Sequence, residues 1–110
     1  MTASMIYVTA GSEKEALSIG RALVENRLAA CANVLGAITS LYWWEGAVHE
    51  DGEVALILKT RPELVAEAVA RIKELHSYDC PCVVALPISE GNEDYFDWIV
   101  KETGQPADIK

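Results

Sequence analysis

The order of strand and helix patterns constrains the fold of this chain more than any other feature of its sequence. Four stretches are rich in β-branched and aromatic residues, and three others carry apolar residues at helical spacing. The predicted order is strand 5–10, helix 12–26, strand 32–44, strand 53–59, helix 60–76, strand 82–86 and helix 92–103. The chain therefore contains two strand–helix–strand halves that are joined by a hairpin.

Signals for the start of a helix support this order. Ser12 with Glu15, and Thr60 with Glu63, have the spacing of capping boxes. In a capping box each of the two side chains accepts a hydrogen bond from a free backbone N–H at the helix start. Asn92 is a third predicted cap, because its side chain can bond the first free N–H groups of the last helix.

Glycine and proline mark the irregular points and ends of the strands. Gly36 predicts a bulge or bend in the second strand, the polar stretch 45–52 predicts the hairpin tip, and Pro87 closes the fourth strand. The length suits one domain over 1–110, with an ordered core at about 5–103. We expect a ferredoxin-like α+β sandwich with a long central hairpin and an extra C-terminal helix.

The charge and hydropathy of the chain exclude several classes of partner. Asp and Glu number 17 against 9 Lys and Arg, which gives a formal net charge of −8. A field of this sign repels phosphate backbones, so no nucleic acid is expected as a partner. No apolar run reaches the roughly 18 residues of a membrane span, so no membrane partner is expected.

Three cysteines, Cys31, Cys80 and Cys82, indicate the compartment. An odd number suits a reducing environment better than a framework of disulfides. The N-terminus lacks a basic region followed by a long apolar stretch, so it does not resemble a signal peptide. These features predict a cytoplasmic protein.

The third predicted strand is apolar on both of its faces. Val54, Leu56 and Leu58 share one face, whereas Ala55 and Ile57 share the other. A sheet with one solvated face alternates apolar and polar residues, so both faces are expected to be covered. Another subunit is the predicted cover of the second face, and the alternative is that the third helix folds back over it.

Adjacent tryptophans support the prediction of an oligomer. Trp43 and Trp44 face opposite ways on a strand, so at least one is exposed or buried against a partner. Tryptophan is enriched at interfaces because it buries a large area at a modest entropic cost. We assign Trp43, Trp44 and Trp98, which lies in the third predicted helix, to the subunit interface.

Several separate motifs resemble one known family. The segments LAACAN at 28–33 and TSLYWWEG at 39–46 resemble the central signature of the CutA family, the divalent-cation tolerance proteins. The resemblance continues in order through 53–60, 76–78, 86–88 and 95–99. It implies a ferredoxin-like subunit in a tight homotrimer similar to the PII signalling proteins. It also implies a role in tolerance of divalent cations, copper above all, with no established reaction.

The corner at 76–82, with the sequence HSYDCPC, carries the predicted metal ligands. His76 matches a histidine that the resemblance implies as a ligand, but Cys82 replaces the acidic residue that follows the proline in the family. Thiolate and imidazole suit copper(I) and zinc, so His76, Cys80 and Cys82 are the candidate site. The alternative is that both cysteines are small apolar residues packed at the start of the fourth strand.

Polar residues near the expected subunit boundaries form a second candidate site. Asn33 and Lys59 interrupt otherwise apolar strands, where a polar group needs a partner. They resemble positions that the family shares near clefts between subunits, and the resemblance implies that they line such a cleft with Tyr42 and Tyr78. The cleft either binds an anionic small molecule or partner, as in a PII-like signalling module, or holds a hydrogen-bond network of the interface.

No arrangement in the sequence predicts catalysis. The segment Thr9–Ser12 is not a glycine-rich phosphate loop, and no pairing of nucleophile and base is recognisable. We therefore expect a non-enzymatic protein without an organic cofactor. Its predicted ligand is copper, and its predicted partners are two further copies of the same chain.

Overall fold

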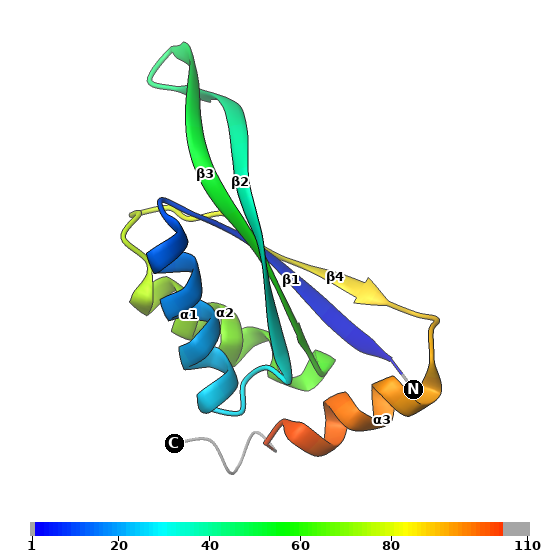
Figure 1. Ribbon diagram of the computed structural model, residues 1–110. Helices are drawn as coiled ribbons and strands as arrows, with labels where there is room; N and C mark the ends of the chain where they lie inside the picture. The colour runs from blue at the N-terminus through cyan, green and yellow to red at the C-terminus, as the bar shows by residue number, and fades with distance from the viewer. Residues whose placement is uncertain (1, 105–110) are drawn as a thin grey trace.

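The computed structural model describes residues 2–104 as a four-stranded antiparallel sheet with two helices on one face and a third helix at one end (Figure 1). The elements are β1 (Ala3–Ala10), α1 (Glu13–Glu25), β2 (Cys31–Trp44), β3 (Ala47–Thr60), a 3-10 turn (Pro62–Leu64), α2 (Val65–Leu75), β4 (Val83–Ile88) and α3 (Glu93–Glu102). The strand order is β2-β3-β1-β4. The predicted α+β class and the ferredoxin-like order of elements are confirmed.

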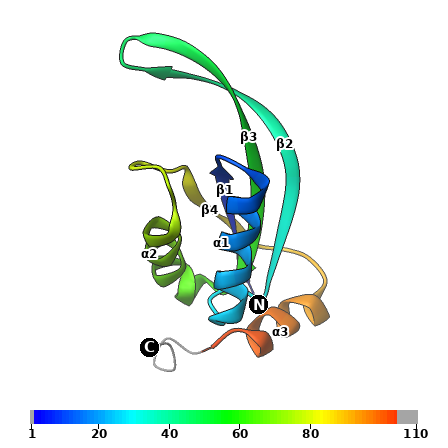
Figure 2. The same ribbon diagram turned by 60° about the vertical axis from the view of Figure 1, so that its left-hand side comes forward.

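The core lies between the sheet and helices α1 and α2, which cover the same face (Figure 2). Alternate side chains of β1 and β3 point to this face, as the period of a strand requires. The largest fully buried side chains of this core come from β1, β3, α1 and α2, and they are Ile6, Val8, Ile19, Leu23, Leu56, Leu58 and Ile72. Burying each such aliphatic side chain contributes about 1.5–3 kcal/mol, so this layer fixes how α1 is placed over β1.

Strands β2 and β3 form a hairpin that extends well beyond the rest of the subunit (Figure 2). The tip is the two-residue turn Glu45–Gly46, with φ values of 50° and 80°. Two successive positive φ angles are typical of a type I′ turn, whose twist matches that of a hairpin. The prediction of a polar tip over 45–52 is therefore wrong, because Ala47 to Gly52 continue β3.

The bulge expected at Gly36 is confirmed. The pairing of β2 with β3 shifts its register between Val34 and Gly36, and Gly36 has a φ of 110°. Only glycine adopts this backbone region without strain. The extra residue bends the hairpin away from the plane of the sheet (Figure 2).

Two predicted helix caps are confirmed and one is wrong. The Ser12 Oγ accepts a hydrogen bond from the Glu15 N–H, and the Asn92 side chain accepts one from the Asp94 N–H. Thr60 instead ends β3, and its hydroxyl is fully buried without a hydrogen-bond partner among residues 2–104. Because β3 continues to this position, the Thr60 side chain cannot turn back to cap a helix.

Pro87 lies inside β4 rather than after it. It pairs with Ser4 of β1, and β4 is an edge strand of the sheet. A proline is compatible with an edge strand because its missing N–H can face away from the neighbouring strand. The predicted end of the fourth strand at Leu86 is therefore too early by two residues.

Helix α3 covers only one end of the second sheet face. Its buried residues Phe96 and Ile99 pack with Ala3 and Ala30. Farther along that face, Leu86 remains 48% exposed. The alternative that α3 covers the whole face is therefore wrong, whereas its cover by another subunit stays a prediction.

The hairpin also presents large apolar side chains to solvent. Trp43 is 75% exposed and Trp44 is 57% exposed, although each belongs to a hydrogen-bonded strand. Trp98 of α3 is partly exposed as well. The assignment of all three tryptophans to a subunit interface stays a prediction. Among residues 2–104, no helix has the length and hydropathy to cross a membrane.

Candidate functional site at the corner between α2 and β4

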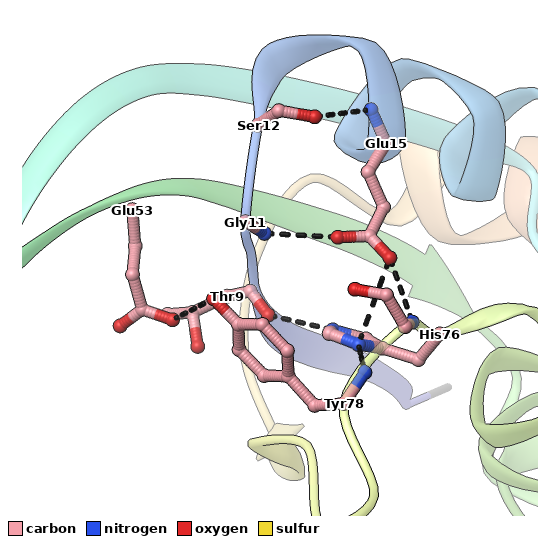
Figure 3. Close-up of polar contacts among 8 residues, drawn as sticks. Thr9, Gly11, Ser12, Glu15, Glu53, His76 and Tyr78 are labelled. Atoms are coloured by element: carbon pink, nitrogen blue, oxygen red, sulfur yellow. Dashed lines mark hydrogen bonds and ion pairs between the residues drawn. The ribbon is translucent and has the colours of Figure 1, made fainter.

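The corner at 76–82 follows α2 and lies beside the start of α1 and the base of the hairpin (Figure 3). It contains no regular element, so side-chain contacts hold it in place. Those contacts come from β1, α1 and β3. The corner therefore meets β1, α1 and β3 at one point.

Glu15 joins the first turn of α1 to the corner. One carboxylate oxygen accepts a hydrogen bond from the Gly11 N–H at 2.9 Å, and the other accepts one from the Ser77 N–H at 2.7 Å (Figure 3). The predicted capping box is thus modified, because Glu15 bonds Gly11 rather than Ser12. Partial burial opposes ionisation of Glu15, but the hydrogen bonds from Gly11 and Ser77 prevail and lower its pKa.

His76 is held on both of its ring nitrogens. Its Nε2 lies 2.8 Å from the carbonyl oxygen of Thr9, and its Nδ1 lies 3.1 Å from the N–H of Tyr78. A carbonyl only accepts and an N–H only donates, so Nε2 carries the proton and Nδ1 accepts. Glu15 lies 3.8 Å from Nδ1, and the His76 side chain is 0% exposed. The ring therefore ties the corner to β1, and the assignment of His76 as a metal ligand stays a prediction.

Tyr78 connects the corner to the hairpin. Its ring lies tilted against that of His76, with centroids 4.7 Å apart, and its hydroxyl donates to Glu53 at 3.1 Å (Figure 3). Burial and then the neighbouring Glu53 carboxylate raise the pKa of Tyr78 to about 12. A Cβ at Gly11 would lie 3.4 Å from the Tyr78 hydroxyl, which is ordinary van der Waals contact, so the ring of Tyr78 lies close against the end of β1.

Tyr42 makes a similar contact farther along the hairpin. Its hydroxyl donates to Asp51, and its ring stacks on His49, its partner across the strands. The hydrogen bond to Asp51 raises the pKa of Tyr42. Tyr42 and Tyr78 therefore each donate a hydrogen bond to a carboxylate of β3, Tyr42 to Asp51 and Tyr78 to Glu53.

Asn33 and Lys59 lie in a different place from the two tyrosines. The Lys59 ammonium lies 5.5 Å from the ring centroid of Tyr95, and the Cys31 sulfur lies 3.4 Å from the Tyr95 hydroxyl. Asn33 approaches the same sulfur at 4.0 Å. The hydrogen bond with Cys31, followed by burial, raises the pKa of Tyr95 to about 12.

Within one subunit the four predicted cleft residues thus form two groups rather than one. Glu53, beside the tyrosines, and Lys59 are six positions apart on β3, and an extended strand rises about 3.3 Å per residue. The two groups are therefore about 20 Å apart, and a single cleft that contains all four stays a prediction. Sequence reasoning missed Glu53 and Tyr95 as partners of these residues, because both contacts cross between elements.

The two cysteines of the corner differ from His76 in their surroundings. Cys80 and Cys82 are both free thiols and both exposed, whereas Cys31 is partly buried. Pro81 alone separates the two exposed thiols. Across residues 2–104, no group of three or more His, Cys, Asp or Glu side chains is arranged to hold a metal ion. One subunit therefore offers the thiol pair without a third donor beside it.

Comparison with known proteins identifies the family. The model of the family described as CutA1 divalent ion tolerance protein matches residues 4–102. The chain belongs to the CutA family. A CutA protein of Thermus thermophilus is 46% identical over 100 residues, which cover 91% of this chain and 97% of the relative. The human protein CutA is 41% identical over 105 residues, which cover 96% of this chain and 59% of the human protein.

Solved CutA structures share the whole fold. The Thermus thermophilus structure superposes with a TM-score of 0.90 at 45% identity, covering 93% of this chain and 99% of that one. The rice CutA1 structure gives a TM-score of 0.92 at 37% identity and covers 96% of each chain. The structure from Archaeoglobus fulgidus, described as a periplasmic divalent cation tolerance protein, gives 0.88 at 43% identity and covers 91% of this chain and 97% of that one.

Proposed function

We propose that this CutA protein is a non-enzymatic, cytoplasmic homotrimer that contributes to divalent-cation tolerance by binding copper at the corner 76–82. Membership of a family named for divalent-cation tolerance supports the general role. The single observation that supports copper is the pair of exposed, free thiols at Cys80 and Cys82.

The chemistry of these donors favours copper over magnesium or calcium. Thiolate is a soft ligand that selects copper(I), whereas hard cations prefer carboxylate and carbonyl oxygens. Cys82 thus directs the site toward soft ions. The net charge of −8 also raises the local concentration of cations, although this effect is diffuse and does not select among metals.

Exposed apolar surface supports the homotrimer. Val84 and Leu86 lie on the sheet face away from α1 and α2, and both are about half exposed. Trp43 and Trp44 expose still more apolar area on the hairpin. Monomeric proteins rarely expose large contiguous apolar patches, so the association of three copies is an economical way to cover both surfaces.

An anaerobic copper(I) competition titration tests this proposal, with the oligomeric mass measured on the same sample. We expect copper to be withdrawn from a colorimetric competitor until one ion is bound per subunit of a trimer. A monomeric mass, or copper left entirely with the competitor, contradicts the proposal.

A second candidate function is a PII-like signalling module with ligand sites between subunits. The observation that favours it is the group formed by Lys59, Asn33 and Cys31, on the sheet face away from α1 and α2, with Tyr95 of α3. A lysine on such a face can attract an anion once a neighbouring subunit excludes water. Calorimetry with ADP as the probe tests this function, and heat of binding that the Lys59→Met variant loses would favour it over copper binding.

A further inference from the structure

We infer that Cys80 and Cys82 alone form a two-coordinate copper(I) site, and that His76 positions the corner without ligating the metal. This inference rests on the proposed copper binding and specifies the atoms that carry it. Three observations support it: the closed hydrogen bonding of His76, the exposure of the two thiols, and the absence of a third donor beside them within residues 2–104.

The ring of His76 has no free nitrogen for a metal ion. Coordination through Nδ1 would displace the Tyr78 N–H, and coordination through Nε2 would leave the Thr9 carbonyl unpaired. The hydrogen bond to Thr9 is buried, and leaving the Thr9 carbonyl unpaired there is costly. The ring is also 0% exposed, so an ion could reach it only after the corner had opened.

The two thiols, in contrast, are accessible and close in sequence. Two Cα atoms two positions apart are at most about 7 Å apart. Two sulfur atoms on opposite sides of one metal ion are about 4.6 Å apart when each metal–sulfur bond is about 2.3 Å. The side chains of Cys80 and Cys82 can span this distance. Pro81 between them fixes one backbone torsion and keeps Cys80 extended, which limits the entropy lost on binding.

The number of donors selects the ion. Zinc takes four ligands and copper(II) prefers a tetragonal set of nitrogen and oxygen ligands. Neither demand is met by the thiol pair alone. Copper(I) has a filled d shell, favours sulfur and is satisfied by two ligands in a linear arrangement. Binding converts Cu⁺ and two thiols into a bis-thiolate with a charge of −1 and releases two protons, without any change in oxidation state.

The role that remains for His76 is to hold the first half of the corner. His76 binds the Tyr78 N–H, and Glu15 binds the Ser77 N–H, so two successive backbone groups are fixed to β1 and α1. The segment that carries Cys80 and Cys82 leaves this anchored point. His76 therefore acts on the site through the backbone rather than through a bond to the metal.

Anaerobic titration of reduced protein against bathocuproine disulfonate tests the inference in four chains. The native chain is expected to bind one copper(I) per subunit. His76→Gln retains a donor in place of Nε2 but loses the Nδ1 acceptor that positions the corner, so it is expected to bind the same number of ions at an affinity lower by at most about tenfold. Cys80→Ser/Cys82→Ser is expected to lose at least about 100-fold in copper(I) affinity. This loss exceeds the one typical of replacing a residue that only orients a metal ligand by a hydrogen bond. Cys31→Ser is the matched control, because it removes a thiol outside the corner and is expected to leave the affinity unchanged.

X-ray absorption of the copper-loaded native chain gives a second readout that requires no variant. We expect a shell of two sulfur atoms and no imidazole scattering. Imidazole scattering, or loss of binding in His76→Gln with unchanged folding, would show that His76 is a ligand and overturn the inference. If the native chain binds copper and the thiol variant binds it equally, the inference fails but copper binding stands. If the native chain leaves all copper with the competitor, the proposed function itself fails.

Discussion

The Glu15 carboxylate lies 2.7 Å from the backbone nitrogen of Ser77, so the first turn of α1 holds the start of the corner between α2 and β4. The same side chain accepts the Gly11 N–H, and its second oxygen faces the ring of His76. One ionised carboxylate thus connects α1, the bend after β1 and the corner. Its charge state is expected to matter for stability.

Glu15→Gln is expected to lower the free energy of unfolding by about 1 kcal/mol at pH 7, because hydrogen bonds to a charged acceptor are stronger than those to an amide. The folded-state pKa of Glu15 is below its ordinary value. Its contribution is therefore present above the unfolded pKa and is lost as the pH falls through the folded pKa. Urea unfolding of the native chain and of Glu15→Gln at pH 7 and at pH 3 gives the free energy of unfolding of each. If the two chains differ in this free energy by the same amount at both pH values, the prediction is contradicted.

His76→Ala is expected to destabilise the fold by about 2–4 kcal/mol, because the Thr9 carbonyl and the Tyr78 N–H both lose their partner. His76→Gln restores one donor and is expected to recover part of this loss. Thermal unfolding of the two variants beside the native chain provides the measurement. Equal melting temperatures for Ala and Gln would show that packing, rather than hydrogen bonding, sets the role of this ring.

Gly36→Ala is expected to cost about 1 kcal/mol or more, because its φ of 110° strains any residue with a Cβ. A Cβ at this position would meet no atom within 4 Å, so the backbone alone explains the expected loss. Gly52→Ala is the matched control, since that position is equally open and has no positive φ. Chemical denaturation measures the free energy of unfolding of Gly36→Ala and Gly52→Ala. Equal values for the two variants would contradict backbone strain at the bulge.

Leu86→Asp is expected to dissociate the proposed trimer, since it places a charge on the exposed sheet face. Leu17→Asp is the control, because Leu17 is similarly exposed at 51% but lies on α1, away from that face. Sedimentation equilibrium at micromolar concentration gives the mass of each variant. If both variants remain trimers, the sheet face around Leu86 is not part of the subunit interface.

Much of the fold could be predicted because its signals are local. Ser12 and Asn92 cap their helices through neighbouring N–H groups, and Gly36 marks the bulge by its own conformation. The prediction of the hairpin tip is wrong because His49, Glu50 and Asp51 are polar and exposed, although they belong to β3. A paired strand that packs against no apolar core can be as polar as a loop, so polarity alone does not distinguish the two.

The site was predicted less completely because its contacts are distant in sequence. The cysteines of the corner indicate it in the sequence, but the hydrogen bond that holds the ring of His76 is to Thr9, which is 67 positions away. The role of Glu15 depends on Ser77, which is 62 positions away. Local sequence patterns indicate Glu15 only as a helix cap, since nothing near it in sequence indicates that its second oxygen has another partner.

The most direct test of copper binding at the thiol pair is the number of copper(I) ions that one native trimer removes from a competitor under anaerobic conditions. We predict three ions per trimer, one at each pair of Cys80 and Cys82, and none at comparable affinity in Cys80→Ser/Cys82→Ser. Undiminished binding in that variant would contradict the thiol site, and no binding by the native chain would contradict a copper function for this protein.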